Sequence, residues 1–170
     1  MKDRIKFSNE MLAAVIDGRK TQTRRIMKPQ PVLNGNFYEV FGAGWSKGIK
    51  RVTVAPGHSL ERNFPYGLVD KKIPFADKDG NIKGEIEITD VWLQRVQDIS
   101  EEDAIAEGVV TGCYGNEGNW LRGFYAPGGN QPHQNAKSAY SEIWRSIYGV
   151  EAWYKNPWCW VVEFKQIQEG

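Results

Sequence analysis

The segment PWCWVVEFKQI at residues 157–167 places the strongest constraint on the fold. Its β-branched and aromatic residues favour an extended strand. A run that is apolar on both faces is typical of a strand in the middle of a sheet. A second strand is predicted at 84–96, where GEIEITDVWLQRV alternates apolar and polar residues after the turn signal KDGN at 78–81. The chain is therefore expected to build its core around a sheet.

Three short helices are predicted around these strands. The first begins after Ser8, a typical N-cap, and ends at Gly18, which suits a left-handed C-terminal stop. The second begins after Ser100 in a capping-box-like pattern, runs to about Glu107 and is ended by glycine. The third covers 136–147, where four apolar side chains recur on one helical face.

The remaining stretches are rich in turn-forming residues. Residues 28–68 contain many Gly, Pro and Asn residues and are expected to form short strands and loops. The stretch at about 111–135 has six glycines and few aliphatic residues, so a long irregular loop is predicted there. We find no repeat, linker or low-complexity tract. Residues 1–170 are therefore expected to form a single α+β domain.

Composition excludes several classes of protein. The net charge of +1 excludes binding to nucleic acid through bulk charge, although a local basic patch remains compatible with it. No stretch is apolar enough for an export signal or a membrane span, so a cytoplasmic protein with reduced thiols is expected. The two cysteines and two histidines are too scattered for a zinc site, and no metal or cofactor is predicted. They are Cys113, Cys159, His58 and His133.

Charge is distributed unevenly along the chain. Residues 1–30 contain eight basic and three acidic side chains, a balance of +5, whereas residues 85–108 contain one basic and eight acidic, a balance of −7. Two interpretations remain open. The two segments could form solvated faces that attract each other in the fold, or a basic surface for phosphate beside an acidic wall that takes part in chemistry.

The basic segment contains the motif GRKTQTRR at 18–25, which combines a glycine, four cations and two hydroxyl groups. In an extended strand, alternate side chains point to opposite faces. The cations therefore cannot all point the same way. One predicted face carries Thr21, Thr23 and Arg25, and the other carries Lys20, Gln22 and Arg24.

This motif resembles the G-x-K-x-x-x-x-R signature of the ASCH domain family, in the form found in its short acetylcytidine amidohydrolase branch. The remainder is similar to the longer ASCH-like proteins common in phages and prophages. Those relatives usually have a further strand after their PYG, and segment 68–84 replaces it here, so that strand is expected to be altered or missing. The matching residues are Gly18, Lys20, Thr23 and Arg25, together with FPYG at 64–67, QDISEEDAIAEGV at 97–109 and the segment 143–164.

The resemblance implies a small, mostly antiparallel PUA-like β-barrel with flanking helices, and an association with RNA or nucleosides. It also implies that the catalytic lysine, threonine and glutamate of the amidohydrolase branch correspond to Lys20, Thr23 and Glu107. A partly desolvated lysine near other cations loses basicity and can remove the threonine proton. A shielded glutamate can protonate the leaving amine.

Three functional hypotheses follow. The first is an RNA- or nucleoside-binding module in which Arg19, Arg24 and Arg25 contact anions and the loop tryptophans Trp45 and Trp120 stack on bases. The alternative for each tryptophan is that it pins its loop to the barrel. The second hypothesis is a hydrolase of acylated nucleosides or an RNA-processing enzyme. The third is a non-catalytic phage accessory protein that binds another protein.

Overall fold

The computed structural model describes residues 2–116 and 118–167, and its core is a six-stranded sheet in the order β1-β7-β8-β11-β2, with β6 also paired to β8. The central position predicted for the C-terminal strand is confirmed, because β11 lies between β8 and β2. The strands are β1 (Ile5–Lys6), β2 (Gln22–Ile26), β6 (Arg51–Thr53), β7 (Lys72–Ala76), β8 (Ile82–Arg95) and β11 (Trp158–Ile167).

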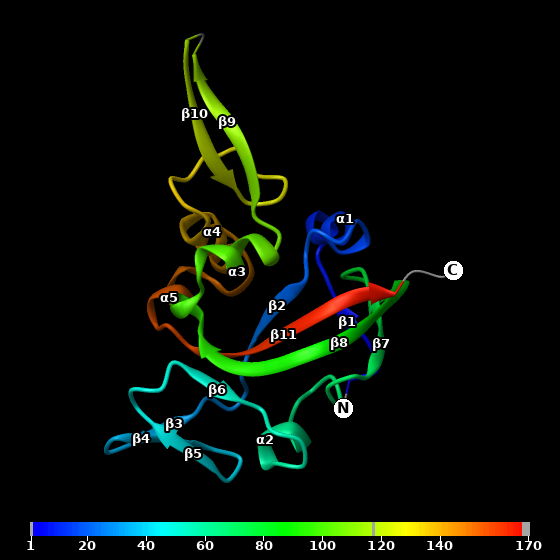
Figure 1. The fold of residues 1–170 in the computed structure, drawn as a ribbon, viewed down its shortest axis with the longest axis vertical. Helices are drawn as coiled ribbons and strands as arrows, with labels where there is room; N and C mark the ends of the chain where they lie inside the picture. Colours follow the sequence, from blue (N-terminus) through cyan, green and yellow to red (C-terminus); the bar gives the residue numbers. More distant parts are fainter. Residues whose placement is uncertain (1, 117, 168–170) are drawn as a thin grey trace.

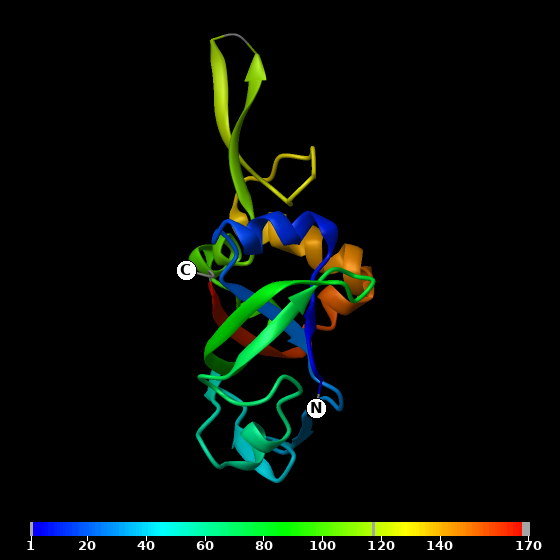
Figure 2. The same cartoon turned by 90° about the vertical axis from the view of Figure 1, so that its right-hand side faces the viewer.

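The sheet is mostly antiparallel. Only the β1–β7 pair is parallel among the pairs in the described part of the chain. The long strands β8 and β11 curve together and curl the sheet into a half-barrel (Figures 1 and 2). A register shift between Glu163 and Phe164 interrupts the β8–β11 ladder, and such irregularities increase local bending. The expected α+β class with a curled antiparallel sheet is confirmed.

The helices begin and end close to the predicted residues. Ser100 Oγ accepts a hydrogen bond from Asp103 N at 3.0 Å and caps α3, whereas Ser8 is extended at the start of α1 and its side chain forms no cap bond. In Figure 2, α1 and α4 lie on the same side of the curled sheet and cover it. The helices are α1 (Asn9–Ile16), α2 (Ser59–Arg62), the 3-10 helix η1 (Val96–Asp98), α3 (Glu101–Ala106), α4 (Ala136–Tyr148) and α5 (Val150–Tyr154).

The hydrophobic core includes side chains from both sides of the main sheet, from α1 and α4 on one side and from residues 38–45 and α2 on the other. Leu93 and Ile86 from β8 are fully buried, as are Phe75 from β7 and Val15 from α1. Trp144 brings α4 into the same cluster. This packing fixes where α1, α3 and α4 lie over the sheet. No helix in the described ranges is long and apolar enough to cross a membrane.

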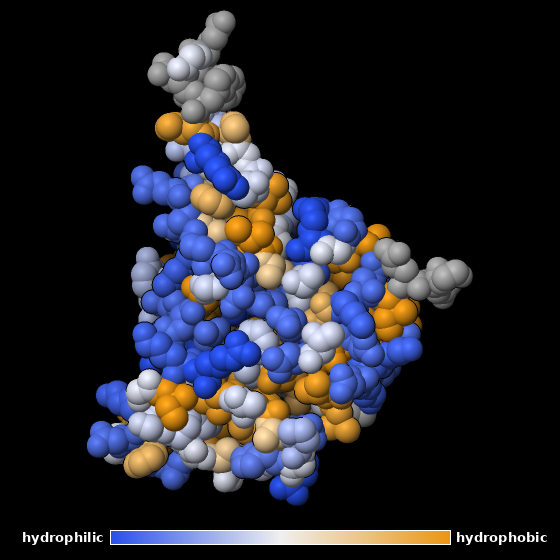
Figure 3. Space-filling view, viewed as in Figure 1, coloured by the Kyte–Doolittle hydropathy of each residue, from blue (hydrophilic) through white to orange (hydrophobic). Residues whose placement is uncertain are grey.

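A small three-stranded sheet forms within the segment predicted to contain short strands and loops. It consists of β3 (Val32–Asn34), β4 (Phe37–Val40) and β5 (Ala43–Ser46), and lies on the opposite side of the main sheet from α1, α3 and α4, next to α2 (Figure 1). Val32, Leu33 and Phe37 are exposed. In Figure 3, hydrophilic side chains cover much of the middle of the face shown, and apolar side chains lie in separate patches from its upper end to its lower end.

The prediction of a long irregular loop at 111–135 is wrong for the first half of that stretch. β9 (Val110–Asn116) and β10 (Asn119–Tyr125) pair as a hairpin that projects from the body (Figure 1). Glycine at 112 and 123 does not break the strands, because each makes room for a cross-strand aromatic ring. A Cβ on Gly123 would lie 2.8 Å from the Tyr114 ring. Glycine in a strand often marks such a close approach.

The strand expected to be altered or missing at 68–84 is present as β7. β7 pairs with β8, and the turn at 77–81 connects the two strands. The segment that stands here in place of the relatives' strand therefore still forms a hairpin. The Asp77 carboxylate accepts hydrogen bonds from the backbone N–H groups of Asp79 and Asn81 and stabilises this turn.

Candidate active site

The helix-to-strand turn between α1 and β2 carries the candidate site. Gly18 adopts a positive φ of 81°, which ends α1 and directs the chain toward β2. Backbone bonds then hold the turn in place: Lys20 N donates to Ala14 O at 2.9 Å, and Thr21 N donates to Ala106 O at 2.8 Å. The second bond joins the turn to the end of α3, where Glu107 follows.

Lys20 and Glu107 form a buried ion pair. Lys20 Nζ donates to Glu107 O at 2.7 Å and to Glu107 Oε1 at 3.2 Å, and each side chain is only 3% exposed. Burial lowers the pKa of Lys20, and the charges of Arg25 and Arg24 lower it further, while the Glu107 carboxylate opposes the shift. The pKa of Lys20 is therefore lowered overall, so its amine becomes neutral at a lower pH than that of a surface lysine.

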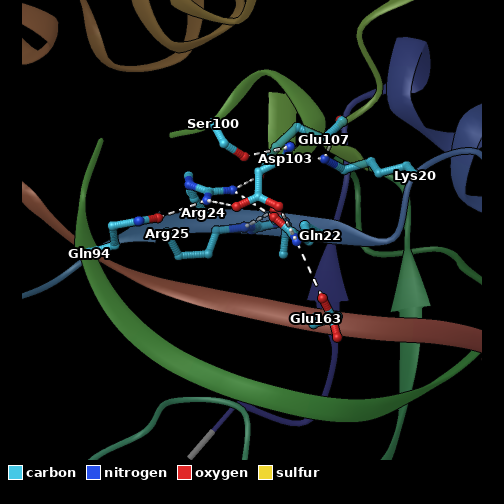
Figure 4. Close-up of polar contacts among 10 residues, drawn as sticks. Lys20, Gln22, Arg24, Arg25, Gln94, Ser100, Asp103, Glu107 and Glu163 are labelled. Atoms are coloured by element: carbon cyan, nitrogen blue, oxygen red, sulfur yellow. Dashed lines mark hydrogen bonds and ion pairs between the residues drawn. The ribbon is translucent and has the colours of Figure 1, made fainter. Parts of the chain in front are cut away.

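Arg24 holds the other side of the Glu107 carboxylate, as Figure 4 shows. Its Nη1 lies 3.3 Å from Glu107 Oε2 and donates to Gln22 Oε1 at 3.0 Å. Its Nη2 donates to Gln94 Oε1 at 3.0 Å and lies 3.5 Å from Asp103 Oδ2. The side chain exposes no surface. The expected anion contact by Arg24 is therefore not supported, because its terminal groups are occupied inside the protein and it positions Glu107.

The opposite face of β2 carries Thr23 and Arg25, as strand alternation predicted. Thr23 Oγ1 accepts a hydrogen bond from Arg25 Nε at 3.1 Å. Arg25 Nη2 donates to Lys6 O at 2.6 Å, and the guanidinium lies over the rings of Phe7 and Tyr66. These contacts fix the Arg25 side chain beside Thr23.

A cavity of about 310 Å³ brings Lys20, Thr23 and Glu107 together. Polar and charged side chains make up part of its lining, and apolar and aromatic side chains make up the rest. Ligand pockets commonly have this composition and a volume near or above this size. The apolar and aromatic residues are Phe7, Met11, Tyr140, Ile143, Trp144, Ile147 and Tyr148.

Several residues of this cavity carry no signal of a binding site in the sequence. Tyr140, Trp144 and Tyr148 follow one another at helical spacing on α4, a pattern that equally indicates a core-facing helix. Burial raises the pKa of Tyr140 well above its usual value, and the nearby Glu107 carboxylate raises it further. Lys6 and Lys78 also line the cavity, although no motif singled them out.

Two predicted binding residues, Arg19 and Trp45, lie outside the cavity. Arg19 is exposed and pairs with Asp17 at 2.8 Å, outside the cavity lining. Trp45 is buried in the small sheet against Tyr38 and Trp158, so it has the packing role that the sequence left open. Trp120 belongs to β10, and its side chain lies outside the described residues.

Within the described part of the chain, no group of three or more His, Cys, Asp or Glu side chains is arranged to hold a metal ion. The polar lining of the cavity instead consists of three ammonium groups, one carboxylate, two guanidinium groups and two hydroxyl groups, from Lys6, Lys20, Lys78, Glu107, Arg24, Arg25, Ser8 and Thr23. Such a set can transfer protons, supply a nucleophile and stabilise negative charge.

Comparison with known proteins places the fold. No protein-family model matches the sequence, and no curated protein matches it. A crystal structure of protein EF3133 from Enterococcus faecalis, of the family model DUF984, is similar with a TM-score of 0.52 at 14% identity, over 98% of this chain and 77% of that chain. An ASCH domain from Lactobacillus crispatus is similar with a TM-score of 0.47 at 12% identity, over 91% of this chain and 68% of that one. At 14% identity, the likeness to EF3133 concerns the fold alone.

Proposed function

We propose that this protein hydrolyses the amide bond of an acylated nucleoside, of the acylcytidine type. The observation that carries the proposal is the convergence of Lys20, Thr23 and Glu107, from a turn, a strand and a helix end, in one cavity with an aromatic wall. The substrate class comes from the resemblance of the 18–25 motif to the acetylcytidine amidohydrolase branch. The cavity supports it by offering apolar surface for an acyl group and a base.

The Lys20–Glu107 pair can exchange one proton across the 3.2 Å that separates Nζ from Oε1. When Lys20 is neutral and Glu107 protonated, Lys20 accepts the Thr23 hydroxyl proton as Thr23 Oγ1 attacks the acyl carbonyl. The C–N bond then breaks, and Glu107 protonates the leaving amine. This step leaves an ion pair of Lys20 and Glu107 and an acyl ester on Thr23.

Water completes the reaction by attacking the Thr23 ester, which releases the carboxylic acid and restores the hydroxyl. Arg25 places a positive charge beside the reacting centre, with its Nε 3.1 Å from Thr23 Oγ1, and this charge favours the negative charge that develops on the tetrahedral intermediate. Thr23 accepts that hydrogen bond, so its own proton stays available for transfer.

Incubation of the purified protein with acetylcytidine, followed by chromatography, tests the proposal. We expect the wild type to release cytidine, and Lys20→Ala and Thr23→Ala to release none. Arg19→Ala is the matched control, because Arg19 lies on the same turn but outside the cavity. Circular dichroism of each variant separates loss of activity from loss of fold. Equal turnover by wild type and Thr23→Ala would contradict the proposed nucleophile.

A second candidate is nucleoside or RNA binding without turnover. It is favoured by the position of Lys20 Nζ, which bonds to Glu107 and, among the described residues, makes no hydrogen bond to Thr23 Oγ1. Binding of this kind predicts that Thr23→Ala changes affinity little and that affinity for RNA falls steeply with salt. The same purified variants separate the two candidates.

A further inference from the structure

A second cavity, of about 830 Å³, lies beside the active-site cavity on the β1 side. Lys6 and Arg25 line both cavities and therefore mark the boundary between them. The second cavity is formed by the strand β1 with the residues before it, by Tyr66, and by the turn between β7 and β8. Nothing in the mechanism above uses this space.

The lining of the second cavity carries excess positive charge. Four of its side chains are basic, Lys2, Arg4, Lys6 and Arg25, and two are acidic, Asp3 and Asp79, which leaves an excess of two positive charges. Within the lining, Arg4 pairs with Asp3 at 3.1 Å and also donates to Gly80 O at 2.7 Å. This pairing offsets the Asp3 charge and leaves the other cations to act on a ligand.

Lys6 and Arg25 retain hydrogen-bonding capacity toward the cavity. In the described ranges, the exposed ammonium group of Lys6 forms no hydrogen bond or ion pair. Arg25 uses its Nε, Nη1 and Nη2 atoms once each, for Thr23, Tyr66 and Lys6 O. A guanidinium has five N–H groups, so two remain for an anion. Charge-assisted bonds of this kind recognise phosphate well.

We propose that the second cavity is a phosphate subsite for a ligand whose nucleoside occupies the cavity around Lys20 and Thr23. The inference rests on the nucleoside-binding part of the proposed function and specifies its ligand as a nucleotide. Arg25 connects the two parts, since one guanidinium contacts Thr23 on one side and the backbone of Lys6 on the other. The phosphate can belong to a mononucleotide or to an RNA chain.

The test compares the binding of cytidine, cytidine 5′-monophosphate and a short oligocytidylate RNA to the full chain by calorimetry. We expect the monophosphate to bind at least about tenfold tighter than cytidine, with a preference that declines as salt rises. The double variant Lys2→Gln, Lys6→Gln should lose most of this preference. Lys50→Gln is the matched control, an exposed lysine outside both cavities.

Equal affinity for cytidine and its monophosphate would overturn the subsite, as would a preference that survives in the double variant. Tighter binding of the oligonucleotide than of the monophosphate would identify RNA as the source of the phosphate, and equal binding would identify a mononucleotide. Because the readout is binding, it is independent of turnover. A phosphate preference without hydrolysis of acetylcytidine would refute the proposed reaction and leave the subsite standing.

Discussion

Glu107 is the residue on which the buried polar cluster depends, because its carboxylate accepts from both Lys20 and Arg24. Glu107→Ala would leave two buried cations without that partner, and we expect it to lower the free energy of unfolding by about 3 kcal/mol. Lys20→Met should cost less, since Arg24 still pairs with Glu107. Urea denaturation of both variants measures the difference. A larger loss in Lys20→Met than in Glu107→Ala would contradict this account.

The lowered pKa of Lys20 makes stability depend on pH in the alkaline range. Between the lowered pKa and the ordinary value of 10.5, the unfolded chain binds a proton at Lys20 that the folded chain does not. Stability therefore rises with pH across that window. We expect the free energy of unfolding of the wild type, minus that of Lys20→Met, to be greater at about pH 10 than at about pH 8. The same difference at both pH values would argue against a lowered pKa.

At the scale of elements, two serines occupy the N-cap position of a helix, but only one of them forms a side-chain cap bond. Ser100 Oγ caps α3 through Asp103 N, whereas Ser8 forms no side-chain cap bond at α1. We expect Ser100→Ala to lower the free energy of unfolding by about 1 kcal/mol and Ser8→Ala by less than about 0.5 kcal/mol. Urea denaturation provides both values, and each serine serves as the control for the other. Equal losses would show that the cap bond is not the cause.

The β9–β10 hairpin should open more readily than the main sheet. It projects from the body, and its Leu121 side chain is 58% exposed, so little apolar burial supports it. The amides of β8 and β11 lie in the middle of a sheet packed on the core. Hydrogen exchange followed by mass spectrometry should show faster exchange in 110–125 than in 158–164. Equal protection would mean that the hairpin is held by contacts beyond its own ladder.

At the scale of the whole molecule, local sequence signals predicted the helices and strands more reliably than they predicted the contacts that these elements make with each other. Caps, helical periodicity and the 157–167 run predicted three helices and the central strand, since these signals depend on near neighbours in the chain. The β9–β10 hairpin was missed because Gly112 and Gly123 resemble loop residues. Only cross-strand packing of Tyr125 and Tyr114 makes them compatible with strands.

The site was predictable only in part. The family resemblance singled out Lys20 and Thr23 within the 18–25 motif, together with Glu107, which is distant in the sequence. Alternation along β2 separated Thr23 from Arg24, but it could not show that Arg24 points into the protein toward Glu107. The α4 side chains around the cavity look like core residues in the sequence, because a helix face packed on a cavity has the same periodicity as one packed on a core.

The two thiols differ in exposure, and the reaction of the buried Cys159 reports on global opening of the molecule. Cys113 is exposed on the projecting hairpin, whereas Cys159 is fully buried in β11, where burial raises its pKa and suppresses the reactive thiolate. Under native conditions we expect a thiol reagent to modify Cys113 rapidly and Cys159 only as fast as the central sheet opens. Glu107→Ala should accelerate the second reaction and leave the first unchanged, because it destabilises the body and not the hairpin. The Cys113→Ser variant isolates the slow phase, and rapid loss of its single thiol in the folded protein would contradict the central position of β11.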